Sequence, residues 1–227
     1  MMSSKTQTMV YTGEFWTGSV CAGLCEGFQK AGIAVQAVDL KHFLGLPEQG
    51  FFGKLRNKIE RRSRIEKWKS ELHRQIKLIH PDYFFTIKRT VFSHDELESL
   101  TRGGIRTGIF YPDVSFSHPN VELEALKAFN VIATTKKFHL EFLKEHCPNS
   151  IIKYVPHGYT PSSHIKCFDT VTENQYYHDI FYAGNFSEHK ATFLQSFLDL
   201  IRSADYDFAI TGPSWKSKDY IFLRECF

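Results

Sequence analysis

An aspartate that follows a predicted buried strand is the residue of this sequence best suited to acid–base chemistry. The segment Ile105–Tyr111 is predicted to be a strand, and Asp113 follows it closely. Ligands bind outside the carboxyl ends of the strands in open parallel sheets, so this carboxylate is expected at a binding edge. There it could take a proton from an attacking hydroxyl group, or it could simply cap the turn after Pro112. Asp113 is therefore the candidate base, with Glu14 and His118 as weaker alternatives.

A second group of residues could bind phosphate. Gly184 and Asn185 follow a predicted strand at Ile180–Ala183 and precede a helix that begins near Ser187. Such a turn directs backbone N–H groups and the positive end of a helix at an anion, and Lys190 would add a positive charge. The functional interpretation is contact with a diphosphate. The alternative is an ordinary turn between a strand and a helix, which uses the same residue types.

Other strand ends carry glycine, tryptophan or histidine. Gly13 and Trp16 lie in the loop after the first predicted strand, where the indole could support an acceptor. This loop lacks the lysine and hydroxyl pair of a Walker loop. His157 and Gly158 follow another predicted strand, and Gly212 ends the strand predicted at 207–211. Each of these residues could contact a ligand, or could be explained by the turn alone.

Strands alternate with helices along the chain at the spacing of a doubly wound, mostly parallel α/β sheet. Strands are predicted at residues 8–12, 33–40, 83–87, 105–111, 131–134 and 151–155. A further strand–helix–strand segment, with strands at 180–183 and 207–211, predicts one βαβ unit. One such unit cannot bury both faces of its sheet. The sequence therefore predicts an N-terminal Rossmann-like domain at residues 1–160, a linker at 161–177, and the first part of a second Rossmann-like domain at 178–227.

The most basic segment is 54–77, which holds ten Lys and Arg against three Glu in a chain of net charge +3. Ile65, Trp68 and Leu72 begin an apolar stripe at helical spacing, and a kink or a second helix near 61–64 would reconcile the earlier apolar residues with it. The basic face could bind nucleic acid, a membrane surface or an anionic glycan. A solvated outer face is the commoner explanation.

The composition is that of a globular protein, with 42% hydrophobic and 15% aromatic residues. No apolar run approaches the roughly 20 residues that span a bilayer, and no apolar signal core opens the sequence. Five scattered cysteines favour reduced thiols, and Cys21 and Cys25 lack the second pair that a zinc site needs. We expect a cytoplasmic protein without a metal or cofactor.

Several segments together resemble the CgeB-like (spore-maturation type) glycosyltransferases, which have the GT-B fold. These segments are YTGEFWTGS, PDYFFTIKR, GIRTGIFYPDVSFSH, NVIATTKKFHLEFLK, YVPHGYTPSSH, DIFYAGNFSEHKATFLQSFL and ITGPSW. The resemblance spans about residues 9–215 and depends on the order and spacing of weak motifs.

The resemblance implies that the N-terminal domain takes a glycan or other hydroxyl acceptor and the C-terminal domain takes a nucleotide-sugar donor. Transfer would occur between them without an obligatory metal. Members of the family continue well beyond the strand at 207–211, which implies that the donor domain of this chain is truncated.

Two other classes of function remain open at this stage. The chain could be a non-catalytic binding fragment or pseudoenzyme, or a module that binds an anionic polymer or a membrane surface through the helix at 54–77. An incomplete second domain would also expose apolar surface, so self-association is expected.

Overall fold

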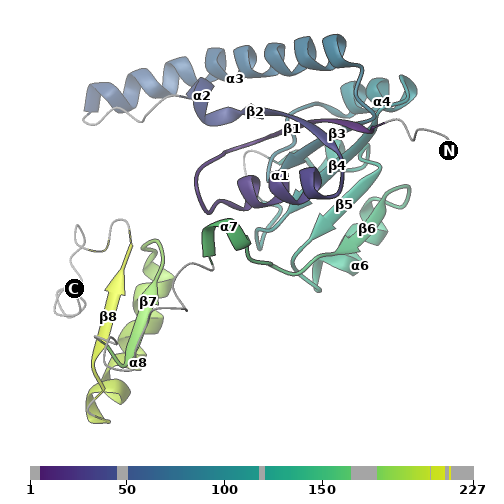
Figure 1. Cartoon of the computed structure of the whole chain (residues 1–227). Coiled ribbons are helices and arrows are strands. Elements are labelled where there is room, and N and C mark those ends of the chain that lie inside the picture. Colours follow the sequence, from purple (N-terminus) through teal and green to yellow (C-terminus); the bar gives the residue numbers. More distant parts are fainter. Residues whose placement is uncertain are drawn as a thin grey trace. The chain divides into compact units, whose positions relative to one another are not determined.

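The computed structural model describes residues 6–44, 51–117, 121–164, 178–204, 206–212 and 215 (Figure 1). The chain divides into two compact units, residues 1–166 and 167–227.

The first unit contains, among its described residues, a six-stranded parallel sheet of order β2-β1-β3-β4-β5-β6 (Figure 1). The strands are β1 (Thr8–Gly13), β2 (Ala34–Asp39), β3 (Tyr83–Ile87), β4 (Arg106–Tyr111), β5 (Val131–Thr134) and β6 (Ile151–Tyr154). The chain adds β2 on one side of β1 and all later strands on the other. The carboxyl ends of β1 and β3 therefore flank the point where the strand order reverses, which is where open α/β sheets bind ligands.

Helices cover both faces of this sheet, as doubly wound folds require. They are α1 (Val20–Lys30), α2 (Leu40–Leu44), α3 (Phe51–Ile79), α4 (His94–Arg102), α5 (Leu123–Leu126), α6 (His139–His146) and α7 (Pro161–His164). Alternate residues of a strand face opposite sides, so Val10 joins the core beneath α3, α4, α5 and α6, and Tyr11 joins the core beneath α1. The α/β fold class expected from the sequence is confirmed.

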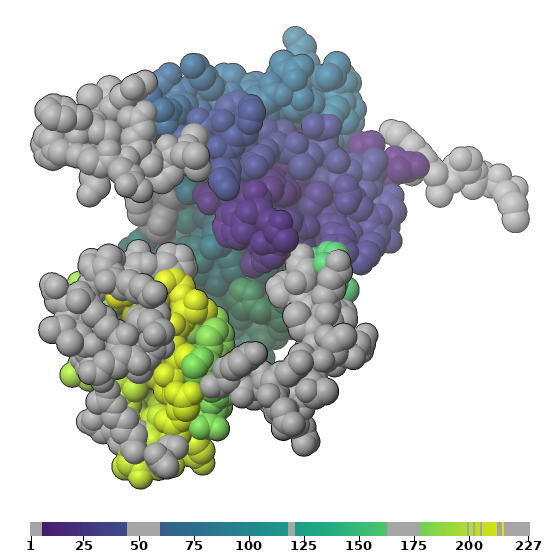
Figure 2. All heavy atoms as spheres, turned by 60° about the vertical axis from the view of Figure 1, so that its left-hand side comes forward, coloured from purple at the N-terminus to yellow at the C-terminus, as the bar shows by residue number. Residues whose placement is uncertain are grey.

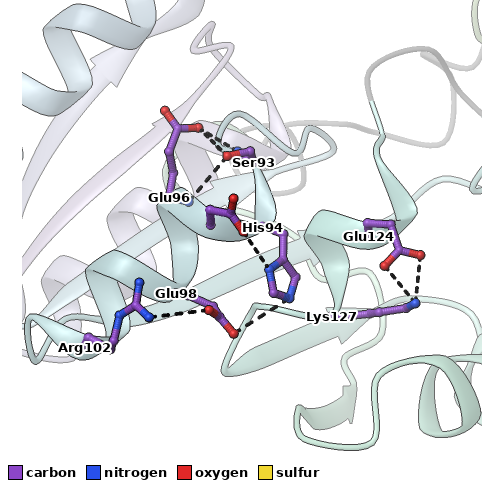
Figure 3. Close-up of polar contacts among 8 residues, drawn as sticks. Ser93, His94, Glu96, Glu98, Arg102, Glu124 and Lys127 are labelled. Atoms are coloured by element: carbon purple, nitrogen blue, oxygen red, sulfur yellow. Dashed lines mark hydrogen bonds and ion pairs between the residues drawn. The ribbon is translucent and has the colours of Figure 1, made fainter.

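Helix ends in the first unit are set by local chemistry. Ser19 caps α1 by accepting a hydrogen bond from the Ala22 backbone N–H at 3.0 Å. Ser93 and Glu96 form a reciprocal capping box at the start of α4 (Figure 3). The helix α3 ends at Ile79, and the next residue, His80, has a φ of 47° and precedes Pro81.

The basic segment lies in one continuous helix, α3, which spans 29 residues. Of the two alternatives expected near 61–64, a kink or a second helix, the second helix is therefore wrong. Trp68, Leu72 and Ile76 are buried in the core, as the apolar stripe predicts.

The second unit contains a βαβ element made of β7 (Ile180–Ala183), α8 (Glu188–Ser203) and β8 (Phe208–Thr211). The two strands pair in parallel. One face of α8 packs on them through buried residues that include Leu194, Leu198 and Ile201. Two further α8 side chains, Phe193 and Leu200, are 63% and 62% exposed. The described helices of both units include none that is long and apolar enough to cross a membrane.

Candidate functional site

A pocket of about 260 Å³ lies at the carboxyl ends of β1 and β3 in the first unit. It is lined by Gly13, Glu14, Trp16, Ser19, Val20, Cys21, Leu40, Ile87, Lys88, Arg89 and Asp113. The structure thus brings together four of the residues predicted from the sequence, which lie at the end of β1 and in the segments that follow β1 and β4. The pocket is located where the reversal of strand order places ligand sites.

Two ion pairs lie at this pocket. The ammonium of Lys88 is 3.4 Å from Oδ1 of Asp113, and both side chains are about half exposed, at 49% and 47%. Nη2 of Arg89 donates to Oε1 of Glu14 at 3.1 Å. Within the described part of the chain, the ion pair with Lys88 is the only one that Asp113 makes. The carboxylate of Asp113 can therefore still accept a proton through its second oxygen.

The backbone around Asp113 is held by side chains from β4, α6 and the β5–α6 connection. Pro112 O accepts from Thr135 Oγ1 (3.1 Å), Val114 O from His139 Nε2 (2.9 Å), and Ser115 O from the Tyr111 hydroxyl. His139 is buried, and its Nδ1 lies 2.8 Å from Oγ1 of Thr134. Burial, and then the nearby charge of Asp113, raise the pKa of Tyr111, which keeps its hydroxyl a donor. Asp113 therefore projects from a backbone that is fixed on both sides.

The loop after β1 is held by Asp39 at the end of the neighbouring strand β2. Oδ1 of Asp39 accepts hydrogen bonds from the backbone N–H groups of Phe15 at 3.2 Å and Lys41 at 2.9 Å. Trp16 is 53% exposed on this loop, at the rim of the pocket. In the space-filling view, purple and violet spheres from the first part of the chain reach the surface (Figure 2). The indole is therefore accessible to a ligand.

Cys21 lines the pocket and is buried together with Tyr11. The Tyr11 hydroxyl donates to Sγ of Cys21 at 3.2 Å. Burial raises the pKa of Cys21 to about 11 and raises that of Tyr11 well above its ordinary range. Both groups are neutral at physiological pH, so Cys21 is a poor nucleophile.

His157 and Gly158 lie at a second pocket of the first unit, which has a volume of about 310 Å³. This pocket is formed by the segment after β6 and by the N-terminal half of α1, and it shares Ser19 and Val20 with the first pocket. The predicted residues of the first unit are therefore divided between two neighbouring pockets. His118 lies outside the described residues.

The predicted phosphate loop belongs to the second unit. Nζ of Lys190 donates to the carbonyl of Asn185 at 3.1 Å, and Oγ of Ser187 accepts from the Lys190 backbone N–H at 3.3 Å. Gly212 has a φ of 139°, and a Cβ there would lie 2.0 Å from the carbonyl oxygen of Gly184. Close packing of two backbones therefore explains Gly212 without a ligand.

Lys88 and Arg89 are not among the site residues predicted from the sequence, although they directly follow β3. Their pairing with Asp113 and Glu14 depends on contacts between strands that are far apart in the chain. Within the described ranges, no group of three or more His, Cys, Asp or Glu residues is placed to hold a metal ion. Cys21, Cys25 and Cys147 are free thiols.

Solved structures with the same fold include nucleotide-sugar enzymes. The chain aligns with a Glycyrrhiza uralensis UGT protein complexed with glycyrrhetinic acid 3-O-monoglucuronide at a TM-score of 0.52 and 9% identity, covering 97% of this chain and 66% of that one. It aligns with UDP-GlcNAc 2-epimerase from Methanocaldococcus jannaschii at a TM-score of 0.57 and 12% identity, covering 96% and 69%. It aligns with the S. aureus MnaA–UDP co-structure at a TM-score of 0.51 and 13% identity, and the alignment covers 97% of this chain and 64% of that one.

These neighbours have the fold of GT-B glycosyltransferases and epimerases, and the chain shares this α/β fold. At such low identities the likeness shows the fold alone. The chain spans about two thirds of the length of these proteins. No family model matches the sequence, and no curated protein matches it.

Proposed function

We propose that the chain belongs to a CgeB-like glycosyltransferase that moves a sugar from a nucleotide-sugar donor to a hydroxyl acceptor without a metal. The first unit would hold the acceptor, and the second unit would be the first part of the donor domain. The observation that carries this proposal is the position of Asp113. Its carboxylate faces a pocket at the strand-order reversal of a GT-B-like fold, on backbone held at both neighbouring carbonyls.

The chemistry assigned to Asp113 is general-base catalysis. As the acceptor hydroxyl attacks the anomeric carbon of the sugar, Asp113 would take its proton. Glu14, whose Oε1 accepts from Arg89 at 3.1 Å, lines the same pocket and is the alternative base. Trp16, exposed at the rim, would contact the acceptor. In the second unit, the turn at Gly184 and Asn185 and the charge of Lys190 would face the donor diphosphate.

The neighbours guide the choice of donor for the first experiments. One is a UDP-GlcNAc 2-epimerase, and another is a co-structure with UDP. We therefore expect UDP and UDP-sugars to raise the Tm of the glycosyltransferase to which the chain is assigned. UDP release would then be measured with the stabilising sugar and a panel of hydroxyl acceptors. If neither UDP nor any nucleotide sugar binds, the proposal is wrong.

Asp113→Asn tests the residue that carries the proposal. This substitution keeps the shape of the side chain and removes its basicity, so turnover should fall by roughly 10²–10⁴-fold with little change in KM. Glu14→Gln is the matched control and should have a much smaller effect. Wild-type turnover in Asp113→Asn would place the base elsewhere.

Binding of an anionic polymer by the basic helix has less support from the structure. Three cations of α3 are engaged within the protein, since Arg64 contacts Glu60, Lys69 contacts Glu96, and Arg74 contacts Glu71. The pairs of Arg64 and Arg74 lie within α3, as is typical of a solvated helix face, and the pair of Lys69 joins α3 to α4.

A further inference from the structure

We propose that Lys88 is a positioning residue for Asp113 and that a strained turn after β3 holds it in place. The inference depends on the proposed role of Asp113 as the base. It adds a functional residue that was not among those predicted from the sequence.

The backbone at Lys88 is in an unfavourable conformation. Lys88 has a φ of 64°, and the Arg89 backbone N–H donates to the Ile87 carbonyl at 2.8 Å. A three-residue turn closed around a central residue of positive φ is rare and strained. Glycine would adopt this conformation without a steric penalty. The side chain of Lys88 must therefore provide something that offsets the strain.

Stability does not account for the lysine. Its ion pair with Asp113 joins two side chains that are each about half exposed, and such pairs contribute little to folding. Strained residues that persist without a stability benefit are concentrated at active sites. The location of Lys88 in the pocket lining agrees with a functional explanation.

The geometry indicates what the lysine does. Hydrogen bonds to the carbonyls of Pro112 and Val114 fix the backbone of Asp113, but they leave its side chain free to rotate. The Lys88 ammonium, 3.4 Å from Oδ1, favours one orientation of the carboxylate. One carboxylate oxygen is then held by Lys88, and the other is available to an acceptor hydroxyl. Misplacement of a catalytic group by about 1 Å can reduce the rate by roughly 10²-fold. A change in the orientation of the Asp113 carboxylate should therefore lower the rate measurably.

Three substitutions separate strain from charge. Lys88→Gly removes both the strain and the ammonium, Lys88→Ala removes only the ammonium, and Lys88→Arg keeps a cation. We expect Lys88→Gly to melt roughly 2–4 °C above Lys88→Ala. Both should lose about 10- to 100-fold in kcat with KM nearly unchanged, and Lys88→Arg should recover part of the loss. A purely structural role predicts instead that activity follows Tm.

A crystal structure of Lys88→Ala gives a readout that does not require turnover. We expect the Asp113 carboxylate to rotate away from its wild-type position while the backbone from 112 to 115 stays in place. An unchanged carboxylate would overturn the inference, as would a Lys88→Gly variant that is no more stable than Lys88→Ala. If Asp113→Asn loses turnover while Lys88→Ala and Lys88→Gly keep it, the inference fails and the proposed function stands. Wild-type turnover in Asp113→Asn refutes the assigned base instead.

Discussion

The end of β1 leaves no room for a side chain at Gly13. A Cβ at this position would lie 2.1 Å from Sγ of Cys21 and 2.4 Å from Cγ2 of Ile87. These residues belong to α1 and β3, so three elements meet at Gly13 beside the pocket. This glycine is therefore required by packing, and the ligand contact predicted for it is not needed to explain its presence.

Gly13→Ala should destabilise the protein. Overpacking of this kind typically costs about 1–3 kcal/mol, because neighbours must leave their preferred positions. Urea unfolding measures the change in the free energy of unfolding. Gly27→Ala is the matched control, since Gly27 lies within α1 and a Cβ there meets nothing within 4 Å. The control should gain roughly 0.5–1 kcal/mol in helical propensity. Equal stability of Gly13→Ala and wild type would contradict the packing explanation.

The buried thiol of Cys21 predicts a loss of stability in alkaline solution. Burial raises its pKa from 9.0 to about 11, so the folded chain holds this proton more tightly than the unfolded chain. The stabilisation is complete below pH 9 and is lost as the pH rises toward 11, by on the order of 2 kcal/mol. Urea unfolding at several pH values measures it. Cys21→Ala should show a shallower decline over this range, and an identical decline would exclude the thiol as a cause.

At the scale of elements, α4 is held at its N-terminus by a compact polar network (Figure 3). The Ser93 backbone N–H donates to Oε2 of Glu96 at 2.8 Å, and Lys69 of α3 contacts the same oxygen at 2.8 Å. Burial acts to raise the pKa of Glu96, but the hydrogen bonds from Lys69 and Ser93 outweigh it and the pKa is lowered. Glu96 therefore caps α4 and joins it to α3.

Ser93→Ala should lower the free energy of unfolding by about 1 kcal/mol, because it removes the cap of α4. Ser99→Ala is a suitable control, since Ser99 is an exposed residue of the same helix. It should be neutral or slightly stabilising, because alanine is the better helix former. Chemical denaturation of the two variants measures the difference in their free energies of unfolding. Equal values would show that Ser93 does not stabilise α4 as a cap.

Most elements could be predicted from the sequence, because strands and helices there differ strongly in apolar pattern. The strands around Ile109, Ile132 and Phe208 lie where expected. The helix α3 was harder to predict, since its first part does not share the apolar stripe of its second part. The helix nevertheless continues without a break from Phe51 to Ile79, although its apolar pattern changes along its length.

The site was predictable only in part. Asp113 and Trp16 could be located because they follow recognisable strands. Lys88 could not, because a positive φ at lysine leaves no mark in the sequence, and its partner comes from a different strand. Gly13 was recognised, but its close neighbours Cys21 and Ile87 are visible only once the fold brings them together.

At the scale of the whole molecule, the second unit has an outer apolar surface on α8. Phe193 and Phe197 stack with ring centroids 6.3 Å apart, and Leu200 lies one turn further along. Phe193 and Leu200 are more than half exposed. A stripe of this kind, outside the buried face that Leu194 and Leu198 form, favours association with another apolar surface.

We expect the chain to self-associate through this stripe. Light scattering should show oligomers whose population falls when Phe193→Ser and Phe197→Ser are combined. Phe138→Ser is the control, because Phe138 is a 65% exposed phenylalanine of the first unit. It should leave the oligomers unchanged. A monodisperse wild-type monomer would contradict the expectation.

The alternation of charges around the first pocket has a consequence for how a ligand reaches it. Two cations, Lys88 and Arg89, face two anions, Asp113 and Glu14, so their formal charges cancel. Such a rim generates little long-range field, and a ligand would arrive by unassisted diffusion. The association rate of a ligand should then hardly change between dilute buffer and strong salt. An uncharged sugar would enter without any loss from the absence of electrostatic steering.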